Sequence, residues 1–243
     1  MLRLLLVAVF CANAVSPTPN LYWSMDGING STLRPDIGDQ VLWQGDLSTI
    51  TGSASITGVK GDAINIEKSH VTIGGGSLPS SDNCIFSPAN CNGGFTIAKW
   101  LNVREWQPSF LFASTFTTTV FPLTGPGFAV FPTNTNNYYS AHALLPNGTR
   151  WFSSIDRTLI PLNTWTHVTM TWSEGNGVKF YLNGTEVATY TESGTDTTTT
   201  SPTTSHLSFG ADQMSIYMDE LKIWFQELSP AEILRNFEDS PAG

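Results

Sequence analysis

The chain has 243 residues, of which only 13% are charged, and it carries a formal net charge of −9 at pH 7. An acidic chain with so few Lys and Arg residues lacks the basic surface that nucleic acid or an anionic membrane would attract. A chain of this length can bury a sizeable core without a dense set of disulfides. These properties argue against nucleic-acid and membrane partners and favour one large globular domain.

Residues 1–14 have the features of a secretory signal peptide. Arg3 supplies a positive charge, an apolar run follows over residues 4–11, and small residues at 12–14 suit a cleavage site. The apolar run is too short to span a bilayer, and no later run in the sequence approaches that length. We therefore expect a secreted, extracellular protein whose single domain covers residues 15–243.

Most segments alternate apolar and polar residues with period two and end in Gly, Pro or Asn, which predicts an all-β protein. An early strand lies in "NLYWSMDG", and a pair of strands is expected over residues 63–67 and 70–73. A clear strand follows over residues 95–103, and further strands lie in "SFLFAST" and "GFAVFPT". The segments "NYYSAHALL" and "TRWFSSI" flank Asn147-Gly148, a dipeptide favoured in tight turns, and predict a hairpin.

Cysteine use agrees with secretion. Cys11 falls within the signal peptide, which leaves Cys84 and Cys91 as an even pair. In an oxidising compartment these two residues are expected to form a disulfide that closes "CIFSPANC". A zinc site is not expected, because two thiols at this spacing without a nearby His pair do not make a zinc ligand set.

Three sequons for N-glycosylation begin at Asn29, Asn147 and Asn183, and each contains Asn-Gly. Their alternative interpretation is that they are turn residues that match the motif by chance. Eight Thr residues occur within residues 191–205, a stretch with too little apolar surface to pack. This stretch is expected to be either a mobile polar loop or an O-glycosylated, mucin-like segment.

The strongest pattern starts at Trp165. In "WTHVTMTW" the side chains of Val168, Met170 and Trp172 share one parity and are expected to face the core. A turn over residues 174–177 leads into "VKFYL", and Asn183-Gly184 closes a second hairpin into "TEVATY".

A short C-terminal helix is predicted to start at Ser229-Pro230-Ala231-Glu232, a capping box with Pro at the first helical position. Its apolar side chains are expected to lie on the sheet. They are Ile233, Leu234 and Phe237.

In their order and spacing, these segments resemble the laminin G-like jelly-roll domains of the concanavalin A-like lectin and glucanase superfamily. The matching pieces are "YWSMDG", "GVKGDAI", "GGFTIAKWL", "WTHVTMTW", "VKFYLNGTEV" and "MDELKIWFQELSPAEI", whereas residues 104–160 match only by their general strand pattern. The resemblance implies an antiparallel jelly-roll sandwich of two sheets. It also implies a module that binds extracellular glycans or matrix and cell-surface proteins, often with calcium.

Asp219 shares parity with Leu221 and Ile223, so its carboxylate is expected to point toward the interior and to need donors or a cation. In the resembled superfamily the corresponding acid often helps to hold a structural calcium ion. The matching neighbours here are Asp26 and the Gly61-Asp62 turn, whose oxygens would suit calcium. The alternative is that Asp219 caps backbone amides.

Lys99 departs from the family pattern, which usually has a small or apolar residue at this position of the "FTIAKW" strand. Because Lys99 shares parity with Ile97 and Leu101, its amine must reach water or meet a partner. An edge position with the amine in water is the favoured interpretation. The alternative is a concave binding face that uses the charge.

The ligand contacts are expected in the least family-like stretch, where Tyr138, Tyr139 and Trp151 lie near several Asn residues. Exposed aromatic rings with polar neighbours suit a glycan or peptide surface, although aromatic residues in sheets are more often in the core.

Enzymatic activity is not expected. The chain has no E-x-D-x-E string that would put two carboxylates on one strand face, as glycosidases of this superfamily have. The sequence therefore predicts a secreted, non-catalytic recognition module. A glycan-cleaving enzyme on the same scaffold and a structural or adhesive matrix component are the alternatives.

Overall fold

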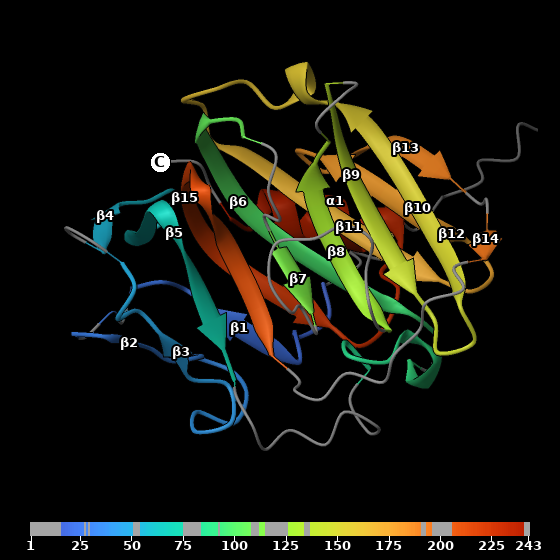
Figure 1. Ribbon diagram of the computed structural model, residues 1–243, viewed down its shortest axis with the longest axis horizontal. Helices are drawn as coiled ribbons and strands as arrows, with labels where there is room; N and C mark the ends of the chain where they lie inside the picture. The colour runs from blue at the N-terminus through green and yellow to red at the C-terminus, as the bar shows by residue number, and fades with distance from the viewer. Residues whose placement is uncertain are drawn as a thin grey trace, which may run out of the picture.

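In the computed structural model shown in Figure 1, the chain is described in eleven ranges. They are residues 16–26, 28, 30–50, 54–74, 84–91, 93–107, 112–114, 126–133, 137–190, 193–195 and 206–240. The predicted signal peptide and Asn29 lie outside these ranges. None of the described helices is both long enough and apolar enough to cross a bilayer.

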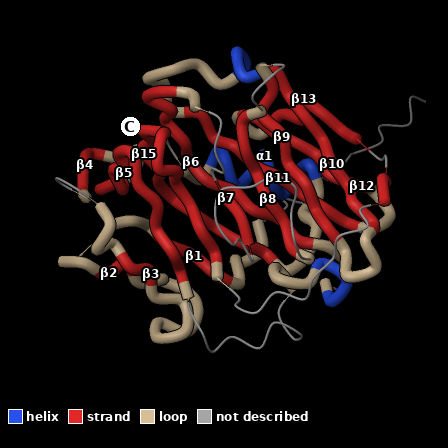
Figure 2. The backbone as a smooth tube through the Cα atoms, in the orientation of Figure 1, coloured by secondary structure: helices blue, strands red, loops and turns tan. Residues whose placement is uncertain are grey.

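The described chain consists mainly of antiparallel strands (Figure 2). The strands are β1 Leu21–Trp23, β2 Thr32–Leu33, β3 Gly45–Asp46, β4 Ser55–Thr57, β5 Asp62–Ile73, β6 Phe95–Glu105, β7 Phe112–Ser114, β8 Gly127–Pro132, β9 Tyr138–Leu144, β10 Thr149–Asp156, β11 Thr166–Ser173, β12 Gly177–Leu182, β13 Thr185–Tyr190, β14 Ser193–Thr195 and β15 Leu207–Trp224. The helices are the 3₁₀ turns η1 Pro88–Asn90 and η2 Arg157–Leu159 and the α-helix α1 Pro230–Glu238.

The hydrogen-bonded path β13-β12-β11-β6-β15-β7-β8-β9-β10-β14 folds over itself into two layers. Strand β10 contacts β12 and β13 across the core without pairing with either of them, so β9 and β10 overlie β11 and β12 in Figure 1. One large cluster of buried apolar side chains fills the space between the layers. The predicted all-β jelly-roll sandwich is confirmed.

Strand β15 holds the two layers together because it changes partners along its length. Its first part pairs with β7 and β5, and its last part pairs with β6 and β1. The exchange of β5 for β1 takes place between Met218 and Leu221, where a bulge interrupts the pairing with β6 and Glu220 adopts a φ of +51°. A bulge of this kind leaves room for a side chain at the junction of three strands.

The hairpins predicted beyond residue 137 are confirmed. Strands β9 and β10 pair around Asn147, and β11, β12 and β13 pair through the turns at 174–176 and 183–184. Val168, Met170 and Trp172 are at most 2% exposed and belong to the central core cluster, as their parity predicts.

Helix α1 begins with the predicted capping box, in which the Ser229 and Glu232 side chains each bond the other's backbone N–H. The helix covers the outer face of β6 and β11, where Phe237 contacts the rings of Trp100 and His167 (Figure 1). Ile233 is buried there, whereas Leu234 is 42% exposed. The predicted helix and its docking on the sheet are confirmed, although Leu234 contributes less burial than expected.

Two predictions about local structure are wrong. The separate strands expected over 63–67 and 70–73 form the single strand β5, because Lys68 takes a φ of +46° at a bulge and the pairing with β15 continues beyond it. Within the Thr-rich segment, Ser193–Thr195 are not loop but the short strand β14, which pairs with β10. The rest of that segment lies outside the described residues.

The edge position predicted for Lys99 is also wrong. Strand β6 is an interior strand that pairs with β11 on one side and β15 on the other. Lys99 is 2% exposed, and its Nζ lies 5.1 Å from the centroid of the Phe112 ring. Burial lowers the pKa of Lys99 to about 8, because water no longer stabilises the ammonium form.

Candidate functional site

Asp219 sits at the junction where β15 exchanges β5 for β1, and its carboxylate is fully buried. Oδ2 accepts the backbone N–H groups of Val59 at 2.8 Å and Lys60 at 3.0 Å. Oδ1 accepts the N–H of Glu220 at 2.8 Å. The alternative given for this residue, a cap on backbone amides, is therefore what the structure shows.

The bulge also changes the parity on which the interpretation of Asp219 rested. Met218 and Leu221 both belong to the central core cluster although they are three residues apart, so the alternation does not continue through residues 219–220. Asp219 is buried against the turn that precedes β5 instead of pointing between the two sheets.

The turn over residues 58–61 is shaped to fit the two carboxylates. A Cβ on Gly58 would lie 2.5 Å from Oδ2 of Asp219, and a Cβ on Gly61 would overlap Oδ1 of Asp26. Oδ1 of Asp26 also accepts the N–H of Asp62 at 2.7 Å. Asp26 and Asp219 thus hold the same turn from two sides.

The Asp219 carboxylate needs no calcium ion to offset its burial, because three amide hydrogens already satisfy it. A calcium site at Asp219 and Asp26 stays a prediction. In the described part of the chain, no three His, Cys, Asp or Glu side chains gather closely enough to hold a metal ion. Burial raises the pKa of Asp219 to about 6, and the amide donors oppose this rise.

The neighbouring Glu220 is buried as well, but it has partners of its own. It accepts the hydroxyl of Tyr22 at 2.6 Å and forms an ion pair with Lys222 at 3.1 Å. Burial and this carboxylate raise the pKa of Tyr22. The two adjacent acids therefore serve two separate structural contacts.

The aromatic ligand surface predicted from Tyr138, Tyr139 and Trp151 is not formed. Tyr138 is 43% exposed, but Tyr139 is fully buried and contacts the ring of Phe180 in the core. Trp151 faces Ala143 across the β9–β10 pair and packs against the same core cluster. Because adjacent residues of a strand point to opposite faces, Tyr138 and Tyr139 cannot share one surface.

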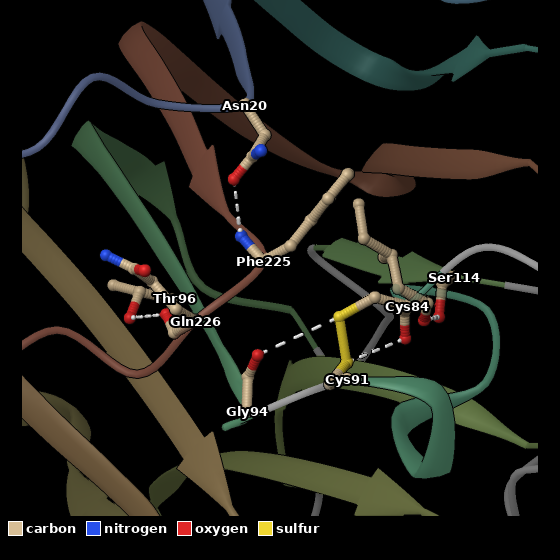
Figure 3. Close-up of a disulfide and its surroundings, with 9 residues drawn as sticks. Asn20, Cys84, Cys91, Gly94, Thr96, Ser114, Phe225 and Gln226 are labelled. Atoms are coloured by element: carbon tan, nitrogen blue, oxygen red, sulfur yellow. Dashed lines mark hydrogen bonds between the residues drawn. A yellow bond between two sulfur atoms is a disulfide. The ribbon is translucent and has the colours of Figure 1, made fainter.

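The predicted disulfide between Cys84 and Cys91 is present, and Figure 3 shows it beside Gly94 and the start of β6. Of the described sequons, Asn147 lies at the β9–β10 turn and Asn183 at the β12–β13 turn, both exposed. Their Oδ1 atoms accept the N–H groups of Thr149 and His167. N-glycosylation at these positions stays a prediction.

A cavity of about 390 Å³, which we call the disulfide pocket, opens next to the Cys84–Cys91 loop. It is lined by the loop around η1, by Gly93 and Gly94, by the β11–β12 turn and by Glu227 after β15. These segments are far apart in the sequence, and none of them lies between residues 101 and 164, where ligand contacts were expected. Sequence reasoning missed this site because no local motif marks it.

The side chain of Glu227 in the disulfide pocket is fixed by hydrogen bonds and an ion pair. Its Oε2 accepts the Ser173 hydroxyl at 2.6 Å and the Asn176 amide at 2.7 Å. Its Oε1 forms an ion pair with Lys179 at 3.0 Å. These donors outweigh the effect of burial and lower the pKa of Glu227, so the carboxylate stays ionised at neutral pH.

Comparison with known sequences identifies the family over most of the described chain. A family model described as the concanavalin A-like lectin/glucanases superfamily matches residues 70–234. No curated protein matches the sequence.

Solved structures with a similar fold are receptor-binding domains of bacterial toxins. The receptor-binding domain of botulinum neurotoxin C/D mosaic serotype has a TM-score of 0.61 and 12% identity, with 91% of this chain and 51% of that chain covered. The ligand-binding domain of botulinum neurotoxin serotype D, in complex with N-acetylneuraminic acid, has a TM-score of 0.59, 13% identity and coverages of 93% and 52%.

The binding domain of Paraclostridial Mosquitocidal Protein 1 has a TM-score of 0.59 and 15% identity, with coverages of 90% and 52%. The chain thus spans about half the length of these structures, and at such low identities the likeness concerns the fold alone.

Proposed function

The chain belongs to the concanavalin A-like lectin/glucanase superfamily, and from that premise we propose that it is a non-catalytic recognition module for an extracellular glycan or protein. The observation that carries the proposal is the disulfide pocket, a cavity lined by polar groups of the β11–β12 turn, by Glu227 and by a disulfide-bonded loop. Concave sites of this size with a few fixed polar groups are typical of ligand binding.

The solved structures of similar fold support recognition over catalysis. They include a receptor-binding domain and a ligand-binding domain, the latter in complex with N-acetylneuraminic acid. Secretion is part of the proposal and rests on the signal-peptide features of residues 1–14. Calcium is not part of the proposal, because three amide donors satisfy the buried Asp219 carboxylate without an ion.

A glycan-cleaving enzyme is the second candidate, since Glu174 and Glu227 both line the disulfide pocket. Glycoside hydrolysis needs one carboxyl group that is protonated and donates its proton to the leaving group. Glu227 is held in the ionised form by Ser173, Asn176 and Lys179, so it cannot supply that proton at neutral pH. Cleavage would therefore require the exposed Glu174 as the proton donor, whereas binding requires neither acid to be protonated, so binding is the first candidate.

The proposal is tested with a fluorescently labelled mature chain, residues 15–243, applied to a glycan array and to a panel of extracellular-matrix and cell-surface proteins. Saturable binding to at least one glycan class or protein is expected. A folded chain that binds nothing on either surface would contradict the recognition function. Binding only to matrix proteins would replace the lectin interpretation with an adhesive one.

A further inference from the structure

We propose that the disulfide pocket binds one uncharged sugar ring, the terminal residue of a neutral glycan. This inference rests on the proposed recognition function and adds the place and the chemical class of the ligand. A cavity of about 390 Å³ is at the small end of the range for small-molecule sites, so it suits a ligand of one or two rings.

The lining of the pocket is partly apolar and partly polar, as the surface of a sugar ring is. Pro88, Ala89 and Cys91 supply apolar lining, which suits the C–H face of a pyranose. Glu174 and Asn176 supply polar lining. Both are exposed, so a ligand in the pocket can reach their side chains, which can accept and donate hydrogen bonds to ring hydroxyls in place of water.

The charges of the pocket favour a neutral ligand over an anionic one. Lys179 pairs with Glu227 and offsets its charge, which leaves the exposed carboxylate of Glu174 as the uncompensated charge of the lining. The chain as a whole carries a formal net charge of −9. A carboxylated or sulfated sugar would be repelled by the Glu174 carboxylate at close range and by the negative net charge of the chain at longer range.

Backbone contacts and hydrogen bonds join the segments that line the pocket. A Cβ on Gly94 would overlap the backbone carbonyl of Trp172, so the β6 and β11 chains meet here backbone to backbone. Glu227 donates its N–H to the carbonyl of Gly93 at 3.1 Å, and the hydroxyl of Ser173 accepts the N–H of Asn176 at 3.2 Å. Fixed walls reduce the entropy lost on binding, which matters most for a small, weakly binding ligand.

The test titrates the mature chain with the methyl glycosides of glucose, galactose, mannose and N-acetylglucosamine. Glucuronic acid and N-acetylneuraminic acid serve as charged counterparts, and amide chemical shifts are the readout. At least one neutral glycoside is expected to shift the amide signals of Gly93, Gly94 and Gly175 in a saturable way, and both acids are expected to bind more weakly.

Two variants locate the binding. Ala89 is exposed on η1, and Ala89→Trp places a bulky ring in the pocket and is expected to abolish binding. Glu174→Gln removes the exposed carboxylate and is expected to weaken binding of the neutral glycoside roughly tenfold, because a charge-assisted hydrogen bond becomes a neutral one. The matched controls are Leu159→Trp on the exposed helix η2 and Glu67→Gln on β5, and both are expected to bind like wild type.

Saturable shifts confined to the pocket and lost in Ala89→Trp would support the proposal. It would be overturned if no neutral glycoside shifted the pocket amides, or if the acids bound more tightly. If Ala89→Trp kept the glycan-array binding of wild type, the recognition function would stand and the pocket assignment would fail. If Ala89→Trp did not fold, the Glu174→Gln variant would decide. Weaker binding of the neutral glycoside than in wild type would support the pocket assignment, and unchanged binding would overturn it.

Discussion

The carboxylate of Asp219 accepts the backbone N–H of Val59 at 2.8 Å and thereby ties the last strand of the sandwich to the turn before β5. The two residues are 160 positions apart, so the contact closes most of the fold. The buried carboxylate satisfies three backbone N–H groups, two in the turn before β5 and that of Glu220 at the bulge in β15.

Asp219→Asn is expected to lower the free energy of unfolding by about 1–3 kcal/mol, because the amide group cannot accept all of these hydrogen bonds and turns its NH2 group toward the N–H of Glu220 or toward those of Val59 and Lys60. Chemical denaturation measures the change. The control is Asp26→Asn, whose exposed side chain accepts one N–H from the same turn and should cost less. Equal stabilities of wild type and Asp219→Asn would refute the capping role.

Calcium removal is expected to leave the melting temperature unchanged. A site saturated at about 100 times its Kd would raise the free energy of unfolding by about 2.7 kcal/mol, which a thermal melt detects readily. Melting curves are compared in chelator and in millimolar calcium at constant ionic strength. A clear rise in melting temperature on adding calcium would contradict this prediction and support a calcium site.

Acid is expected to destabilise the protein below about pH 6.5. Burial lowers the pKa of both His142 and His167 to about 3, so the unfolded chain binds protons that the folded chain does not. Each histidine therefore reduces the free energy of unfolding by about 1.4 kcal/mol per pH unit as the pH falls from about 6.5 to about 3.

The readout is the denaturation midpoint as a function of pH. His167→Gln removes one of the two groups and should give a shallower dependence on pH over this range. A slope that is the same in the variant and in wild type would contradict the assignment.

Lys99→Met is expected to stabilise the protein by roughly 1–3 kcal/mol at pH 7, since an apolar side chain of similar length replaces a buried ammonium whose contact is the Phe112 ring. The folded pKa lies near 8, below the unfolded value, so wild type gains stability as the pH rises above 8. The difference between the two proteins should therefore shrink toward pH 10. A variant less stable than wild type would mean that the amine has a stabilising partner.

The sequence predicted the fold well where local pattern determines structure. The hairpins around Asn147 and Asn183 and the capping box at Ser229 depend on neighbours in the chain, and all three are confirmed. The position of Lys99 depends on which strands flank β6, and those strands come from distant parts of the sequence. Local alternation places the side chain toward the core but cannot tell an edge strand from an interior one.

The candidate sites were harder to predict, for the same physical reason. One bulged residue at Glu220 interrupts the parity argument for Asp219, and no sequence pattern marks a bulge of this kind. The opposite orientations of Tyr138 and Tyr139 did follow from strand geometry and were knowable in advance. The disulfide pocket combines a loop, a turn and Glu227 from segments more than 50 residues apart, so only the folded chain reveals it.

The central claim, that the protein binds a glycan without cleaving it, has one direct test. The mature chain is incubated for a prolonged time at neutral pH with a glycan that it binds on the array. The glycan is then recovered, and its mass is measured by mass spectrometry. The expected result is saturable retention with the glycan recovered at its original mass. Shortened glycan, released at a rate that depends on protein concentration, would contradict the claim and establish the chain as a glycan-cleaving enzyme.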